Sequence, residues 1–282
     1  MKSIRKHLCE ISAQLSNEVS LQKSDALFEA RILLQKALEV SRIWLILHEQ
    51  DILEAHQQDA FEALVKRRLS GEPIAYIIGS REFYGLQLKT TSATLIPRPD
   101  TEILVESALA KIPENLNLDV LDLGTGTGAV ALAVAKNRCN SIVTAIDASA
   151  GALSVALENA QALKLNNVRL LESNWFSALQ SEKFDLIVSN PPYIAQDDGH
   201  LKQGDLRFEP ISALVSGKDG LDDIRKIILD APHYLKSNGW LMLEHGYDQS
   251  DAVAALLSER GFSQIAHAKD IAGTLRVTFG AF

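Results

Sequence analysis

The spacing of apolar residues in the first eighty positions is that of helices. Between residues 26 and 38, apolar side chains recur three or four positions apart, as on one buried helix face. Ser24 is the expected N-cap of this helix. A second stretch, residues 52–69, is predicted to be helical and to end at Gly71. Because neither glycine nor proline precedes Gly71, residues 1–80 are predicted to form a small all-helical domain.

The pattern changes after residue 71. Glycines and prolines now separate short apolar runs, such as residues 86–88 and 94–96, that are typical of β-structure. We interpret residues 81–100 as a hairpin-like linker between two domains.

From residue 101 to residue 282, short apolar runs alternate with helical stretches. This alternation predicts an α/β domain with a doubly wound, mostly parallel, seven-stranded sheet. The last two strands are too close in sequence for a crossover helix, so we expect them to form an antiparallel pair at one edge. The predicted strands cover residues 119–123, 142–146, 168–171, 184–188, 240–244, 264–268 and 275–279.

Composition narrows the class of protein. The 282 residues are 46% hydrophobic, enough for a sizeable core, and the net charge is −8. Residues 1–85 contribute −1 and the remainder −7. Because proteins that bind duplex nucleic acid usually have a basic face, we expect a protein or small-molecule substrate and no direct contact with nucleic acid.

Location and assembly follow from similar arguments. The chain has only two cysteines, Cys9 and Cys139, and the apolar run 43–47 is far too short to cross a membrane. We therefore expect a cytoplasmic protein with reduced thiols and no membrane association, and a monomer by default. No His/Cys cluster has the spacing of metal ligands, so no metal is expected.

A glycine-rich loop follows the first predicted strand of the α/β domain. Gly124, Gly126 and Gly128 alternate with Thr125 and Thr127 before a helical stretch. Glycines allow a sharp turn and let a ligand approach the backbone.

An acid lies at the usual distance from this loop. Asp147 follows Gly126 by 21 residues and ends the next strand, where a carboxylate can bind ribose hydroxyls. The pattern also satisfies the dinucleotide fingerprint. A loop built on alternate glycines suits a nucleoside without phosphate, such as S-adenosylmethionine.

A rigid tetrapeptide follows the fourth predicted strand. The sequence Asn190-Pro191-Pro192-Tyr193 contains two residues with fixed φ, and each proline also favours an extended conformation in the residue before it. In a doubly wound sheet with its switch point between the first and fourth strands, this tetrapeptide lies beside the glycine loop.

Such a tetrapeptide can bind a planar NH₂ group. The Asn190 side-chain oxygen and the Pro191 carbonyl can accept both N–H bonds, and Tyr193 can pack on the planar face. The nitrogen loses its proton after methyl transfer, so no general base is needed beforehand. Catalysis then consists of positioning and electrostatic stabilisation.

These motifs together resemble the HemK/PrmC family, the release-factor glutamine methyltransferases. The similarity extends over nearly the whole chain and includes GEPIAYIIG at 71–79, EFYG at 82–85 and IPRPDTE at 96–102. Each motif alone occurs in other methyltransferases, whereas their order after a helical domain is specific. The resemblance implies a class I S-adenosylmethionine-dependent methyltransferase fold.

The resemblance also implies an activity and a set of site residues. The activity is methyl transfer from S-adenosylmethionine to the glutamine amide nitrogen in the Gly-Gly-Gln motif of class 1 release factors, which residues 1–80 would contact. The loop from Gly124 to Gly128 would line the methionine part, Asp147 the ribose and Trp175 the adenine. Asn190 would touch cofactor and substrate, and Pro191, Pro192 and Tyr193 would complete the glutamine pocket.

Several alternatives stay open. A ribosomal-protein glutamine methyltransferase or an N6-adenine DNA methyltransferase would share the same motifs, although the acidic charge argues against the latter. A nicotinamide-dependent dehydrogenase would use the glycines and Asp147 but leave the tetrapeptide without a role. A non-catalytic, cofactor-binding scaffold would recruit partners through residues 1–80. Trp175 alone is equally well a packing residue, and Glu209 and residues 217–221 have no role that the sequence reveals.

Overall fold

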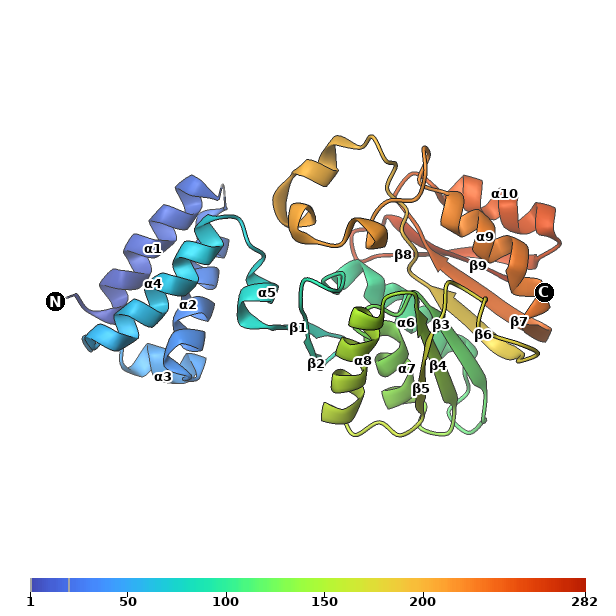
Figure 1. Ribbon diagram of the computed structural model, residues 1–282, viewed down its shortest axis with the longest axis horizontal. Helices are drawn as coiled ribbons and strands as arrows, with labels where there is room; N and C mark the ends of the chain where they lie inside the picture. Colours follow the sequence, from blue (N-terminus) through green and yellow to red (C-terminus); the bar gives the residue numbers. More distant parts are fainter. Residues whose placement is uncertain (1, 20) are drawn as a thin grey trace. The chain divides into compact units, whose positions relative to one another are not determined.

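The computed structural model describes residues 2–19 and 21–282 (Figure 1). It divides into two compact units. Unit 1 contains the residues up to Gly79 together with Lys202–Phe208, and unit 2 contains Ser80–Leu201 and Glu209–Phe282. The division into residues 1–80, 81–100 and 101–282 as parts with separate roles stays a prediction.

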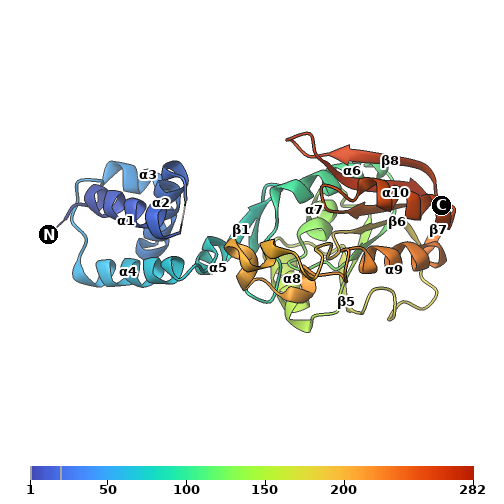
Figure 2. The same cartoon turned by 90° about the horizontal axis from the view of Figure 1, so that it is seen from above.

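Unit 1 is a bundle of helices around one apolar core (Figures 1 and 2). Ile4, Leu15, Leu33 and Phe61 are fully buried in it. Because apolar residues lie on one stripe of each helix, packing the helices together removes these stripes from water. The helices are α1 (Ile4–Glu18), α2 (Lys23–Leu38), α3 (Arg42–Leu47), α4 (Ala55–Leu69) and α5 (Ile74–Ile78).

Two predicted helix starts in unit 1 were wrong. Helix α2 already begins at Lys23, so Ser24 lies inside its first turn and its hydroxyl donates to Asp25 at 3.3 Å. Helix α4 begins at Ala55 rather than at residue 52, because the Gln57 side chain accepts the Glu54 backbone N–H at 3.0 Å and caps the helix there.

Unit 2 begins with an antiparallel hairpin and continues into a seven-stranded sheet. The hairpin pairs β1 (Ser80–Phe83) with β2 (Leu86–Lys89). Residues 94–96 form no strand; the prediction of β-structure there was wrong, because Thr94 N–H instead closes a turn on the Thr91 carbonyl. The strands of the large sheet are β3 (Asp119–Leu123), β4 (Ile142–Asp147), β5 (Val168–Glu172), β6 (Phe184–Ser189), β7 (Leu235–Glu244), β8 (Ser263–Lys269) and β9 (Leu275–Ala281).

The order of the large sheet is β5-β4-β3-β6-β7-β9-β8. The first five strands in this order are parallel, whereas β9 runs antiparallel to both β7 and β8. The prediction of a doubly wound, mostly parallel sheet with an antiparallel pair at one edge is confirmed. The insertion of β9 between β7 and β8 was not predicted, since strand patterns do not encode strand order.

Helices cover both faces of this sheet (Figure 1). Alternate residues of β3 supply the two cores, with Val120 in one and Leu121 in the other. Helices α6 (Glu102–Lys111), α7 (Ala129–Asn137) and α8 (Ala150–Ala162) cover one face, and α9 (Asp222–Asp230) and α10 (Ser250–Arg260) the other. Short 3₁₀ helices are η1 (Pro99–Thr101), η2 (Gly199–Lys202), η3 (Gly204–Phe208), η4 (Ile211–Ala213) and η5 (Ala231–His233). Within residues 2–19 and 21–282, no helix is both long and apolar enough to cross a membrane.

The topological switch point of the sheet, where the strand order reverses, lies between β3 and β6. Leu123 lies opposite Ser189 in the parallel register, and the Ser189 hydroxyl donates to the Leu123 carbonyl at 2.7 Å. The residues that follow, Gly124 and Asn190, therefore start side by side at the carboxyl edge. This neighbourhood was predicted from the sequence and is confirmed.

A buried ion pair offers a test of unit 1. Arg68 donates to both oxygens of Glu29, at 2.6 and 3.2 Å, and only 5% of the Arg68 side chain is exposed. Glu29→Gln should lower the free energy of unfolding by about 3 kcal/mol, because the guanidinium loses its buried counter-charge. Urea denaturation measures the difference. Glu10→Gln removes the exposed Lys2–Glu10 pair and should leave the free energy of unfolding almost unchanged. Equal losses of unfolding free energy in the two variants would contradict the prediction.

Candidate active site

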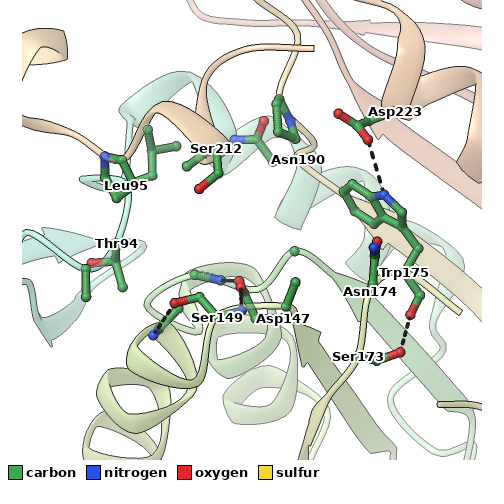
Figure 3. A pocket seen from close by; sticks show the side chains of 18 residues that line it. Thr94, Leu95, Asp147, Ser149, Ser173, Asn174, Trp175, Asn190, Ser212 and Asp223 are labelled. Atoms are coloured by element: carbon green, nitrogen blue, oxygen red, sulfur yellow. Dashed lines mark hydrogen bonds between the residues drawn. The ribbon is translucent and has the colours of Figure 1, made fainter. Parts of the chain in front are cut away.

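A cavity of about 460 Å³ lies at the carboxyl edge of the sheet in unit 2 (Figure 3). Its size is typical of small-molecule binding sites. In Figure 3, Asp147 and Ser149 lie below the open space, Trp175 and Asp223 on one side, and Thr94 and Leu95 on the other. The remaining lining residues are Ala93, Gly124, Gly126, Ala148, Ala152, Ser173, Asn174, Asn190, Pro192, Pro210, Ser212 and Ala213.

The glycine loop presents bare backbone to this cavity. Gly124 and Gly126 have φ values of +72° and +57°, which glycine adopts without steric cost. A Cβ atom on Gly126 would meet nothing within 4 Å, and one on Gly124 would lie 3.5 Å from the Trp175 ring. The loop therefore leaves its backbone accessible to a ligand.

The other loop residues mainly support the loop. Thr125 donates its hydroxyl proton to Asp122 at 2.6 Å, and burial raises the pKa of Asp122 to about 6. A Cβ atom on Gly128 would lie 2.9 Å from Leu132 in the following helix. Gly128 is not among the residues that line the cavities described here, whereas Thr125 and Thr127 line a second, smaller one.

Asp147 is oriented by the backbone on both sides. One carboxyl oxygen accepts the Gly126 N–H at 2.9 Å and the other accepts the Ser149 N–H at 2.9 Å. Burial raises the pKa of Asp147. Each oxygen keeps a further lone pair, so the carboxylate can still accept hydrogen bonds from a ligand in the cavity.

Trp175 is held at the cavity wall in an unusual backbone conformation. Its φ is +51°, which is strained for a bulky residue and is found more often at functional sites. The indole N–H donates to Asp223 at 3.2 Å (Figure 3), and Asp223 also accepts the Ser216 hydroxyl at 2.8 Å. Asp223, which the sequence did not suggest, thus fixes the plane of the ring.

Asn190 lies where the two cavities meet. It also lines a second cavity of about 50 Å³, together with residues of the glycine loop, Arg98 and Thr101. The Asn190 side-chain Nδ2 donates to the Thr101 hydroxyl at 3.1 Å. This bond uses the amide nitrogen, so Oδ1 is the Asn190 side-chain atom left to accept hydrogen bonds from a substrate.

The rest of the tetrapeptide is only partly at the cavity. Pro192 lines the larger cavity, and Pro191 is buried behind it. The Tyr193 hydroxyl donates to Glu244 at 3.4 Å, and burial raises the pKa of Tyr193 well above its usual value. Tyr193 therefore stays protonated, with its hydroxyl directed into the protein rather than into either cavity.

Two segments without an assigned role contact the site, one at Arg98 beside the smaller cavity and the other at Tyr193. Arg98 forms a 2.5 Å ion pair with Glu209, whose side chain is fully buried. Gly220 has a φ of +78°, and a Cβ atom there would lie 2.2 Å from the Tyr193 carbonyl oxygen. Both contacts join residues far apart in sequence, so spacing alone could not reveal them.

Comparison with known proteins places the chain in a family. Residues 12–79 match the PrmC N-terminal domain and residues 100–205 the methyltransferase small domain. The chain is 51% identical over 252 residues to the release factor glutamine methyltransferase of Xylella fastidiosa, covering 89% of this chain and 92% of the relative. The chain belongs to the release factor glutamine methyltransferase family. The relative in Escherichia coli is 45% identical over 90% of this chain and 91% of its own length.

Solved structures agree with the family at the level of fold. A methyltransferase from Pyrococcus furiosus matches 77% of this chain and 96% of its own, with a TM-score of 0.53 and 20% identity. The Thermus thermophilus 16S rRNA N2 G1207 methyltransferase, solved with S-adenosylmethionine and guanosine, matches 72% of this chain and 49% of its own, with a TM-score of 0.51 and 20% identity. The methyltransferase fold and the family resemblance inferred from the sequence are confirmed, and the dehydrogenase and scaffold alternatives are wrong.

The contact between Gly220 and Tyr193 can be tested with a matched pair of variants. Gly220→Ala should lower methyltransferase turnover roughly tenfold or more, because the new methyl group displaces the Tyr193 backbone. Gly273→Ala introduces the same kind of backbone strain at a φ of +86° with nothing within 4 Å and should leave turnover unchanged. Steady-state kinetics on both variants, with thermal unfolding as a check, measure the difference; similar turnover in the two would contradict the role of Gly220.

Proposed function

We propose that this chain transfers a methyl group from S-adenosylmethionine to the side-chain amide nitrogen (N5) of the glutamine in the Gly-Gly-Gln motif of class 1 peptide-chain release factors, and so modulates translation termination. S-adenosylhomocysteine is the second product. The observation behind the proposal is the oriented Asn190 amide beside the glycine loop. Family membership supports the same reaction, since the relatives carry the name release factor glutamine methyltransferase.

The larger cavity fits S-adenosylmethionine. The bare backbone at Gly126 allows close approach, Asp147 can bind the ribose hydroxyls, and Trp175 offers an aromatic face for the adenine. The carboxylates of Asp147 and Asp223 at the wall favour a cationic ligand. When bound, the sulfonium group supplies the methyl group as an electrophile.

The smaller cavity beside Asn190 suits the acceptor amide. A glutamine amide nitrogen is a poor nucleophile because its lone pair is delocalised over the carbonyl. Asn190 Oδ1 and the Pro191 carbonyl can each accept one N–H bond and hold the nitrogen against the reacting methyl group. The nitrogen becomes acidic on methylation and releases its proton afterwards, so none of these residues has to remove a proton before transfer.

Recognition of the release factor is assigned to residues 1–80. The residues up to Gly79, together with Lys202–Phe208, form a compact helical unit with its own core, and residues 12–79 match the PrmC N-terminal domain. A separate unit of this kind is suited to binding a protein substrate. We further propose that the chain acts as a monomer and makes no direct contact with nucleic acid, in keeping with its net charge of −8.

A labelling experiment tests the reaction. The purified protein is incubated with methyl-labelled S-adenosylmethionine and, separately, a class 1 release factor, the same factor with Gly-Gly-Gln changed to Gly-Gly-Ala, and duplex DNA. Label should appear only on the intact release factor, and mass spectrometry should place it on the glutamine. Label on DNA, or equal label on the altered factor, would contradict the proposal.

The separate roles of Asn190 and Asp147 predict opposite kinetic signatures. Asn190→Ala should lower kcat by about 10²- to 10³-fold while largely preserving cofactor affinity, because it removes an acceptor for the reacting amide. Asp147→Ala should weaken cofactor binding. Isothermal titration calorimetry and steady-state kinetics separate the two effects. Normal turnover in Asn190→Ala, or unchanged affinity in Asp147→Ala, would show that the corresponding role is wrong.

A further inference from the structure

A buried glutamate lies directly behind the acceptor site. Glu244 is the last residue of β7, and its side chain is almost completely buried, with 1% of the residue exposed. The parallel register pairs Ser189 with Leu243, so the next residues along the two strands, Asn190 and Glu244, lie at the same level of the sheet. The proposed reaction has no step that uses this carboxyl group.

The contacts of Glu244 lead to both ends of the tetrapeptide. The Tyr193 hydroxyl donates to Glu244 Oε1 at 3.4 Å. The Thr101 hydroxyl lies close enough to the same carboxyl group to lower its pKa, and Thr101 also accepts the Asn190 side-chain N–H at 3.1 Å. Oε2 of Glu244 has no well-formed hydrogen bond to another residue in the described part of the chain.

The charged neighbours of Glu244 affect its pKa in opposite directions. Arg276 on β9 lowers this pKa, and Asp100 on η1 raises it. Arg276 is already paired with Asp100 and Asp270, each at 2.9 Å, and Arg98 acts on the neighbouring Tyr193. Burial is the dominant influence and raises the pKa of Glu244 to about 7.

We propose that Glu244 is a positioning residue for methyl transfer, which acts through Thr101 to fix the orientation of the Asn190 amide and through its hydroxyl contact to fix the Tyr193 ring. The proposal rests on the function proposed above for Asn190. Thr101 has a single hydroxyl proton. If Thr101 donates this proton to the Glu244 carboxylate, it can only accept from Asn190, and Asn190 Oδ1 then faces the substrate.

Protonation of Glu244 should reverse this arrangement. A protonated carboxyl group can donate to the Thr101 oxygen, which frees the threonine proton for Asn190 Oδ1 and favours the flipped amide. The pKa of Glu244 lies above its ordinary value, so the carboxylate is lost as the pH falls through about 7. Correct orientation is therefore present above this pH and lost below it.

Two readouts test the proposal. The first is kcat between about pH 6 and pH 8, which should rise with pH in the unaltered protein and be flat in Glu244→Gln. The second is the pair of Asn190 side-chain NH₂ resonances in ¹⁵N spectra, identified by their loss in Asn190→Ala. These resonances should titrate with a midpoint near pH 7 in the unaltered protein and not in Glu244→Gln.

Companion variants distinguish positioning from a general structural role. Glu244→Gln and Thr101→Val should lower kcat by about 10- to 100-fold, with the dissociation constant for S-adenosylmethionine changed less than about twofold. Thr101→Ser keeps the hydroxyl and should restore most of the activity. Glu158→Gln, which alters an exposed acid paired with Lys89, is the matched control and should behave like the unaltered protein.

The outcomes separate this proposal from the proposed function. Failure of the unaltered protein to label the release factor would contradict the function, while the resonance titration would still test the role of Glu244. An Asn190 amide that titrates identically with and without Glu244 would overturn the positioning role. So would a loss of activity in Glu244→Gln that Thr101→Val does not share.

Discussion

The site depends on the hydrogen-bonded junction between β3 and β6. The Ser189 hydroxyl donates to the Leu123 carbonyl, and the two residues lie opposite each other in the register. Because a parallel register fixes where each strand ends, this junction sets the position of Gly124 relative to Asn190. The roles that we propose for the two strand ends, cofactor binding on one and acceptor binding on the next, both depend on that single alignment.

One buried acid lies behind the glycine loop and another behind the tetrapeptide 190–193. Asp122 supports the glycine loop through Thr125, and Glu244 lies behind Tyr193. For both acids, burial raises the pKa to about 6 and about 7, respectively. Keeping carboxyl groups in an apolar interior costs folding free energy. The strained backbone of Trp175 adds to this cost, so the unit gives up stability to hold these side chains in place.

The sequence predicted the parts of this arrangement that depend on local pattern. The seven strands, the edge pair and the proximity of Gly124 to Asn190 all follow from periodicity and from the rules of doubly wound sheets. Asp147 and Asn190 were found because one ends and the other directly follows a recognisable strand, whereas the adenine role of Trp175 was implied only by the family resemblance. Thr101, Asp223 and Glu244 were not found, because their importance comes from contacts across 48 to 89 positions of the chain.

The place of β9 in the sheet has a consequence for the synthesis of this protein on the ribosome. Strand β7, which ends in Glu244, lies between β6 and β9, and β9 is formed by Leu275–Ala281. Until those residues have left the exit tunnel, one edge of β7 is unpaired and Glu244 lacks part of its covering. The glycine loop and its strands can form much earlier. A partly synthesised chain can thus complete the proposed cofactor side of the site while the side that contains Glu244 is still unfinished, so the complete site forms only after β9 has been translated.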